Sequence, residues 1–392
     1  MKYRRIFLLL LDSIGIGEAQ DAFSYGDAGA NTLKSIVTNY KDLFIPNLTK
    51  LGFLNYLNPD YEKEVNAYYT LARPNNIGKD SLSNYYEIFG VSNKEKFKDF
   101  SKDGFPQDLM KKISNTLNIP IIGNIVTSKR QDVIDELGDR SIQTKSIIIF
   151  TSSNSTLEIA AHEDVVSLPN LIKMGEIVRN KICDKDEYQV GRVIIRPFVG
   201  KNKYRYTNDS KEFALPLNEN TILDNLKDAK KSVISIGKTS DLFNEKGITK
   251  KIMTKDKDSL ESTVGKLLDI MDKNFEGLCV TVLNDFDIAS HNHNIKDLGE
   301  YLEELDVQIP LILNKIDNND LLIIASPNGN DPLSNIPNHT RENVPVIIVG
   351  RLFKENGQLR VLETKADIAA TIAQNFDLDK PPIGTSFLDE LK

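Results

Sequence analysis

Carboxylates and imidazoles gather at two places in this sequence, each after a run of apolar residues. Residues 284–294 hold two carboxylates and two of the four histidines, His291 and His293. A third histidine, His339, lies in a similar polar stretch further along the chain. Open α/β sheets bind ligands at the carboxyl ends of their strands. We therefore expect these side chains to meet at one edge of a sheet.

Short apolar runs predict the strands that would position these residues. They lie at 6–11, 146–150, 232–236, 278–283, 321–325 and 344–349. The first run ends at Asp12 and leads into Gly15 and Gly17, a pattern typical of a buried parallel strand that feeds a turn. The alternative for Asp12 is a cap or turn residue without chemistry.

Helical spacing of apolar residues alternates with these strands. It predicts helices at 259–274, 295–307 and 367–376, and we expect Pro310 to kink or break the second of them. Strands alternating with helices predict an α/β fold, with helices on both faces of the sheet. Between 94 and 217 the chain is richer in lysine, aspartate and asparagine, and strand signals are sparser. We interpret 94–217 as an inserted domain, with the core domain formed by 1–93 and 218–392.

The composition limits the binding partners and the cellular compartment that we expect for this protein. A net charge of -7 argues against a general surface for nucleic acid or anionic membrane. The two cysteines form no CxxC pattern, which fits a reducing cytoplasm. The apolar run at 6–11 is too short for a signal core or a membrane span. We expect a cytoplasmic protein with neither nucleic acid nor membrane as partner.

Several motifs occur along the chain in the same order as in the phosphopentomutases, a family of the alkaline phosphatase superfamily, and resemble the motifs of that family. They are Leu-Asp-Ser-Ile-Gly-Ile-Gly-Glu-Ala at 11–19, Gly-Lys-Asp-Ser at 78–81, Arg-Pro-Phe-Val-Gly at 196–200, Asp-Phe-Asp at 285–287, His-Thr-Arg-Glu at 339–342 and Gly-Thr-Ser-Phe-Leu at 384–388. The resemblance implies an alkaline-phosphatase-like sheet core with an inserted α+β cap domain. It also implies a reaction, the transfer of a phosphoryl group between C1 and C5 of ribose or deoxyribose.

The resemblance further implies two manganese ions and a hydroxyl nucleophile. Ser81 stands where the family has a threonine, and a serine hydroxyl can do the same work. One ion would use Asp12 and Ser81, but the Asp-His pair that completes its ligands falls on Pro327 and Asn328. Proline offers no side-chain ligand atom and asparagine only a neutral one, so we expect this ion to be lost.

The other ion would use Asp287 and His339, which match the family. Its third ligand, a histidine five residues after Asp287, falls on Asn292. A one-residue shift of this loop would bring His291 or His293 to the ion; alternatively both are solvated. We therefore expect at most one manganese ion per chain.

For the sugar phosphate, Arg192 and Lys238 resemble the family's phosphate contacts, and a ribose-contacting aspartate appears as Asn154. The alternative for Arg192 and Lys238 is an ion pair at the surface. His162, which follows two alanines, is expected to be structural.

The sequence thus predicts a phosphopentomutase-like protein that binds a sugar phosphate and whose efficient two-metal activity is weakened or lost. Two alternatives stay open. One is a phosphatase-like enzyme with a single metal ion. The other is a non-catalytic homologue that binds a sugar phosphate or a protein partner.

Overall fold

The computed structural model describes residues 2–93, 95–127, 129–152, 155–183, 187–254, 259–334 and 338–392. The chain divides into two compact units, each described here by itself. The first unit comprises Met1–Lys94, Asn218–Ser240 and Glu245–Lys392, and the second comprises Glu95–Leu217 and Asp241–Asn244. The expected insert, 94–217, covers nearly the same range as the long segment of the second unit.

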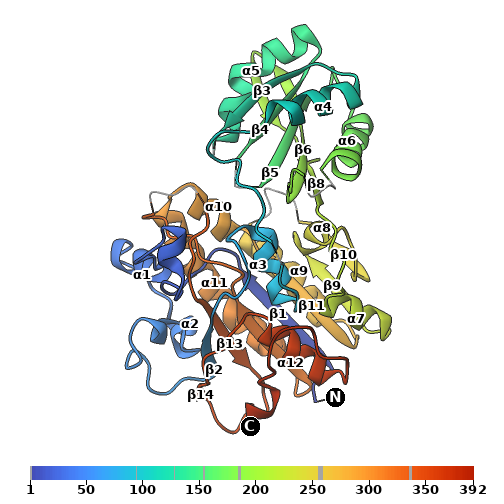
Figure 1. Ribbon diagram of the computed structural model, residues 1–392. Helices are drawn as coiled ribbons and strands as arrows, with labels where there is room; N and C mark the ends of the chain where they lie inside the picture. Colours follow the sequence, from blue (N-terminus) through green and yellow to red (C-terminus); the bar gives the residue numbers. More distant parts are fainter. Residues whose placement is uncertain are drawn as a thin grey trace. The chain divides into compact units, whose positions relative to one another are not determined.

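The first unit is built on an eight-stranded sheet with the order β10-β9-β11-β1-β12-β13-β2-β14 (Figure 1). Its strands are β1 (Arg5–Leu11), β2 (Tyr68–Ala72), β9 (Ser232–Ile236), β10 (Lys250–Ile252), β11 (Gly277–Leu283), β12 (Asp320–Ala325), β13 (Val344–Val349) and β14 (Gly357–Gln358). The five strands from β10 to β12 are parallel, and β13 is antiparallel to both of its neighbours.

Strand β1 lies in the middle of this sheet because its residues are apolar on both faces. Residues Ile6 to Leu11 are all almost completely buried, as expected for a parallel strand covered on both sides. Its register pairs Leu11 with Leu283 of β11 and Leu10 with Ala325 of β12. The segments that follow these three strands therefore leave the sheet at the same edge.

Helices cover both faces of the sheet, which confirms the predicted α/β class. The helices of this unit are α1 (Thr32–Asn39), α2 (Pro46–Lys50), α3 (Ser81–Ile88), α7 (Ile222–Asp228), α9 (Leu260–Met271), α10 (Asp285–His291), α11 (Ile295–Lys315) and α12 (Asp367–Asn375), with α8 (Thr239–Leu242) at the unit boundary and 3-10 turns η1 (Ala22–Tyr25), η2 (Phe53–Tyr56) and η4 (Leu388–Glu390). One face packs Phe7, Leu9 and Leu11 against α1, α2, α9 and α11. On the other side α7 packs against β9 and α12 against α7.

We expected Pro310 to kink or break this helix, and the break is wrong. Helix α11 spans the 21 residues from Ile295 to Lys315, with Pro310 inside it. Proline lacks the N–H that would bond the carbonyl four residues earlier, that of Asp306. The side chain of Asn47 in α2 donates to this carbonyl at 3.1 Å, and so supplies the missing hydrogen bond.

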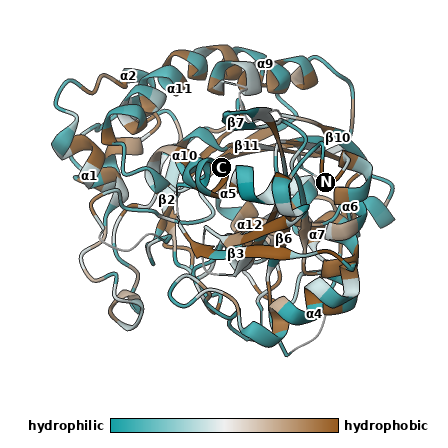
Figure 2. Ribbon diagram, turned by 90° about the horizontal axis from the view of Figure 1, so that it is seen from above, coloured by the Kyte–Doolittle hydropathy of each residue, from teal (hydrophilic) through white to brown (hydrophobic). Residues whose placement is uncertain are grey.

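The second unit contains a separate mixed sheet with the order β3-β4-β5-β6-β7, and β8 also pairs with β6. Its strands are β3 (Ile121–Val126), β4 (Ile147–Thr151), β5 (Thr156–His162), β6 (Arg192–Lys201), β7 (Lys203–Tyr206) and β8 (Lys211–Ala214), and its helices are α4 (Gln107–Leu117), α5 (Arg130–Thr144), α6 (Leu168–Ile177) and the π-helical turn η3 (Val178–Ile182). Figure 2 shows hydrophobic residues along β3 and β6, whereas α4 mixes hydrophobic and hydrophilic residues, as an amphipathic helix does.

No helix in the described ranges is both long and apolar enough to cross a membrane.

Candidate metal and phosphoryl-transfer site

Four strands of the first unit end at one edge of its sheet, and each is followed by a polar residue of the site. In the spatial order β9, β11, β1 and β12, the residues that follow are Lys238, Asp287, Asp12 and Asn328. Because the strands are parallel and adjacent, residues more than 300 positions apart in the chain become neighbours at this edge.

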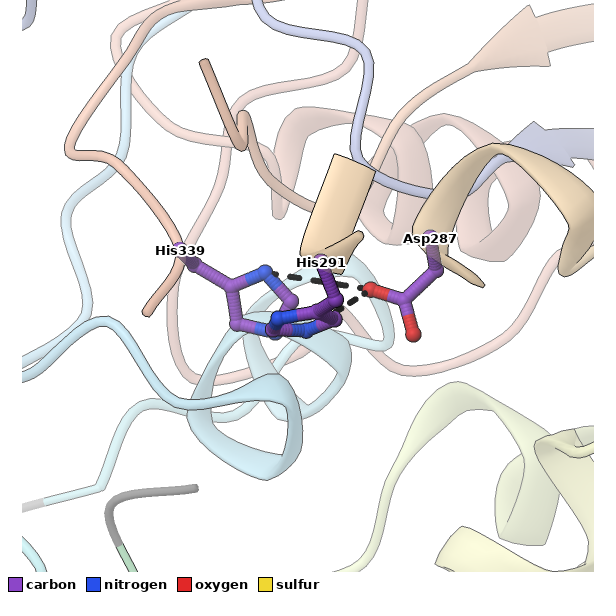
Figure 3. Close-up of side chains that lie close together, drawn as sticks. All are labelled: Asp287, His291 and His339. Atoms are coloured by element: carbon purple, nitrogen blue, oxygen red, sulfur yellow. Dashed lines mark ion pairs between the residues drawn. The ribbon is translucent and has the colours of Figure 1, made fainter. Parts of the chain in front are cut away.

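Asp287, His291 and His339 form a group that could hold a metal ion (Figure 3). Their ligand atoms all lie within 4.8 Å of one another. Asp287 Oδ1 lies 3.4 Å from Nε2 of His291 and 3.9 Å from Nδ1 of His339. The two imidazole rings have centroids 5.0 Å apart. The motif residues Asp287 and His339 thus meet a third ligand for which the sequence left two candidates.

His291 reaches this group because residues 285–291 form a helix rather than a loop. Helix α10 begins at Asp285, so Asp287 and His291 are separated by four residues and share one helix face. His293 lies beyond the end of the helix with a φ of 53°, and its Nδ1 is 2.9 Å from the carbonyl oxygen of Pro332. The structure therefore brings His291, and not His293, to Asp287.

A chain of hydrogen bonds joins the candidate nucleophile to this group. Ser81 Oγ lies 2.9 Å from Nε2 of His339, and the amide nitrogen Nδ2 of Asn328 lies 2.9 Å from Nδ1 of the same ring. Asn328 Nδ2 also donates to Ser13 Oγ at 3.0 Å, and Ser13 donates to Asp287 Oδ1 at 2.7 Å. Ser81 and Asp287 are thus connected through three polar side chains, those of His339, Asn328 and Ser13.

Two features of the backbone place the hydroxyl groups of this chain. Ser13 has a φ of 83°, a left-handed conformation that is costly for a residue with a Cβ and is often found at functional sites. Ser81 is the first residue of α3, and the Asp80 side chain caps this helix by accepting from the Ser83 N–H at 2.9 Å. The nucleophile position therefore lies at the positive end of a helix, where a phosphate group is favoured.

Asp12 faces an ammonium group. Its Oδ2 forms an ion pair with Nζ of Lys238 and accepts a hydrogen bond from the Tyr85 hydroxyl at 3.1 Å. Its Oδ1 is buried and has no hydrogen-bond partner among the described residues. Complete burial raises the pKa of Asp12, although Lys238 opposes this shift. Burial acts in the same direction on Asp287, but Lys238 and His291 outweigh it and hold the pKa of Asp287 well below its usual range.

A buried lysine contacts Pro327, which stands where the resemblance to phosphopentomutases implies a metal ligand. Lys365 Nζ donates to the Pro327 carbonyl at 2.8 Å and to Oδ1 of Asn84 at 2.6 Å, and it lies 3.2 Å from Oε2 of Glu87. Burial lowers the pKa of Lys365 to about 8. No sequence signal pointed to this residue, because lysines are rarely buried.

The described residues gather one set of ligands that suits a divalent ion. One carboxylate and two imidazoles are ligands that manganese and zinc both accept, and they are already gathered around one point. At the other position, Pro327 has no side-chain ligand, and the Asn328 amide directs its N–H toward His339 and Ser13. The one carboxylate there, Asp12, is paired with Lys238.

The remaining candidates lie in or beside the second unit. Arg192, the first residue of β6, lies 3.5 Å from the Glu212 carboxylate. Asn154 falls outside the described residues. His162 is buried; its Nε2 is 3.0 Å from the Gly200 carbonyl, and its ring packs edge-on against Phe198, which fits a structural role.

The sequence of this chain matches a known protein family. The sequence model of the Metalloenzyme superfamily matches residues 4–380, nearly the whole chain.

Solved structures are similar to this chain at low sequence identity, and the first of them shares its fold. The PH0037 protein of Pyrococcus horikoshii is 13% identical, with 97% of this chain and 98% of that chain covered and a TM-score of 0.51. Phosphoglycerate mutase of Leishmania mexicana is 9% identical, with 98% and 97% covered and a TM-score of 0.48. A protein of the alkaline phosphatase superfamily from Vibrio parahaemolyticus is 10% identical, with 99% and 70% covered and a TM-score of 0.45.

Proposed function

Because this chain belongs to the Metalloenzyme superfamily, we propose that it transfers a phosphoryl group from a sugar phosphate to Ser81, with one divalent metal ion bound by Asp287, His291 and His339. The observation that carries the proposal is the contact between Ser81 Oγ and the His339 ring at 2.9 Å. It joins the only motif-derived nucleophile to a group of metal-ligand type. The ion proposed is manganese, as the resemblance to phosphopentomutases implies.

The protein's own residues would position both the nucleophile and the phosphate. The positive end of α3 favours the phosphate next to Ser81. The Ser81 hydroxyl would attack phosphorus and lose its proton to solvent as the P–O bond to the sugar breaks, and the sugar would leave as an alcohol by taking up a proton from solvent. A bound divalent ion would lower the pKa of the attacking hydroxyl and neutralise charge on the phosphoryl oxygens. The phosphoserine would then return its phosphoryl group to another sugar hydroxyl, as a mutase does, or to water, as a phosphatase does.

The proposal can be tested by measuring metal binding and turnover on the same samples. Manganese per chain would be counted after dialysis. Turnover would be assayed with ribose 1-phosphate for the mutase reaction and with p-nitrophenyl phosphate for hydrolysis. We expect one ion per chain and slow turnover, with Ser81→Ala losing turnover but keeping the ion. Asp287→Asn should lose both. Turnover that survives in Ser81→Ala would refute the role of Ser81, and a chain that binds no ion would refute the metal site.

The observations at Asn328 and Lys238 favour a second candidate, a protein that binds a sugar phosphate without turning it over. Asn328 stands where the resemblance implies a ligand of the other ion, and Lys238 pairs with Asp12, which the resemblance implies as another of its ligands. Losing even indirect support for a metal typically costs about 10- to 100-fold in affinity or activity. Calorimetric binding of ribose 5-phosphate, together with no detectable turnover in either assay, would favour this candidate.

A further inference from the structure

Lys238, from the segment after β9, contacts two carboxylates that follow neighbouring strands. Its Nζ forms an ion pair with Asp12 Oδ2 and lies 3.6 Å from Asp287 Oδ2. Strand β11 lies between β9 and β1, so the segments after three consecutive strands supply Lys238, Asp287 and Asp12. One ammonium group thus contacts both the candidate metal ligand Asp287 and the carboxylate at the end of β1.

The surroundings of Asp12 require a positive charge. Asp12 is fully buried, and a buried carboxylate without a partner costs several kcal/mol. Tyr85 donates one hydrogen bond to it, and the same ring lies 5.6 Å from the ammonium nitrogen of Lys238, within reach of a cation–π contact. The positive charge that pairs with Asp12 is therefore supplied by a side chain of the protein, that of Lys238.

Ligands for a second divalent ion are lacking on the opposite side of Asp12. The segment after β12 offers a proline and an amide whose N–H groups already donate to His339 and Ser13. Lys365, a second ammonium group, donates to the Pro327 carbonyl. An incoming ion would meet the Lys365 ammonium group and the Asn328 N–H groups there. Two oxygens, Asp12 Oδ1 and Asn328 Oδ1, are buried without a hydrogen-bond partner among the described residues, and only the first of them is anionic.

We propose that the ammonium group of Lys238 takes the place of a second metal ion. The ammonium group neutralises Asp12 and holds Asp12 and Asp287 together. It also contacts a phosphoryl oxygen of the substrate. The role in substrate contact rests on the proposed function, whereas the role as a fixed cation between the two carboxylates does not.

The test compares Lys238→Met with Lys231→Met in metal-free buffer containing EDTA. These lysines flank β9, have side chains 21% and 26% exposed, and each forms an ion pair with a carboxylate. Lys231 pairs with Glu276, away from the strand edge, and so serves as a matched control. We expect Lys238→Met to lower the melting temperature by roughly 5–10 °C and Lys231→Met to change it by much less. The double variant Asp12→Asn/Lys238→Met should recover at least half of the loss.

Metal counting completes the test. The wild-type chain should hold one manganese ion at millimolar manganese. Lys238→Glu, which places a third carboxylate beside Asp12 and Asp287, should hold two. Three results would each overturn the proposal: a melting temperature of Lys238→Met equal to that of Lys231→Met, two ions in the wild-type chain, or an unchanged ion count in Lys238→Glu relative to the wild-type chain. A wild-type chain without any ion would refute the proposed metal site, and the melting temperatures in EDTA would still decide the role of Lys238.

Discussion

The candidate metal group depends on which histidine lies beside Asp287. Motif resemblance pointed to Asp287 and His339 but counted five residues forward to Asn292 and left His291 and His293 open. The choice depends on whether residues 285–291 are helix or loop, since only helical spacing places the fourth residue on the same face. Helix α10 makes that choice. Lys365 could not be found from sequence at all, because its burial depends on contacts with Pro327 and Asn84 made by distant segments.

At the residue scale, we predict that the two neighbouring histidines differ in their effect on metal binding. His291→Ala should weaken manganese binding by at least about 10- to 100-fold, the range seen when the surroundings of a metal ligand are disturbed. His293→Ala should bind manganese as the wild-type chain does, because its Nδ1 faces the Pro332 carbonyl. Titration calorimetry with manganese measures both. Equal losses in the two variants would contradict the assignment.

At the element scale, the strands were more predictable than the helix ends. Strands buried on both faces read as short, mainly apolar runs, so β9 and β13 match the predicted runs residue for residue. The predicted end of α11 failed because proline acts through one missing hydrogen bond, and a side chain from another element can replace it. Asn47 provides this replacement, and its own α2 is held to α11 by the Asp306 carboxylate, which accepts from the Leu48 N–H at 2.7 Å.

This arrangement predicts an energetic coupling between Asn47 and Pro310. Asn47→Ala leaves the Asp306 carbonyl without that donor and should cost about 1–2 kcal/mol of unfolding free energy. In a Pro310→Ala background the restored N–H can bond the same carbonyl, so the cost should shrink. Thermal or urea unfolding of the four variants of this cycle measures the coupling.

Asn39→Ala is the matched control, since its amide donates to the Ser35 carbonyl, away from any proline. Its effect should be the same with and without Pro310→Ala. Additive effects of Asn47→Ala and Pro310→Ala would show that Asn47 does not replace the missing bond.

At the scale of the whole molecule, the chain folds as two units with separate cores, and the second depends on a buried charge. Glu158 on β5 is fully buried and forms ion pairs with Arg196 and Arg130. Burial alone would raise the pKa of Glu158, but the two guanidinium groups and a hydrogen bond from Ser152 lower it to about 2 from 4.5. The composition of 94–217, richer in lysine, aspartate and asparagine, predicted a separate domain. It could not predict this buried ion pair, because the pair depends on strand pairing that one sequence does not reveal.

The lowered pKa predicts that acid destabilises the second unit. The unfolded chain binds a proton at Glu158 below about pH 4.5, whereas the folded chain resists protonation until about pH 2. Stability from this group is therefore complete above pH 4.5 and is lost as the pH falls from 4.5 toward 2. The shift corresponds to about 3 kcal/mol. The hydrogen-exchange protection of peptides from β5 and β6, corrected for the intrinsic exchange rate at each pH, should fall over this range. In Glu158→Gln the exchange should already be fast at pH 7 and should depend less on pH.

Glu176→Gln removes an exposed ion pair with Lys211 in the same unit and should leave the wild-type profile intact. If Glu158→Gln showed the same profile as Glu176→Gln, the buried ion pair would not be what makes the second unit sensitive to acid.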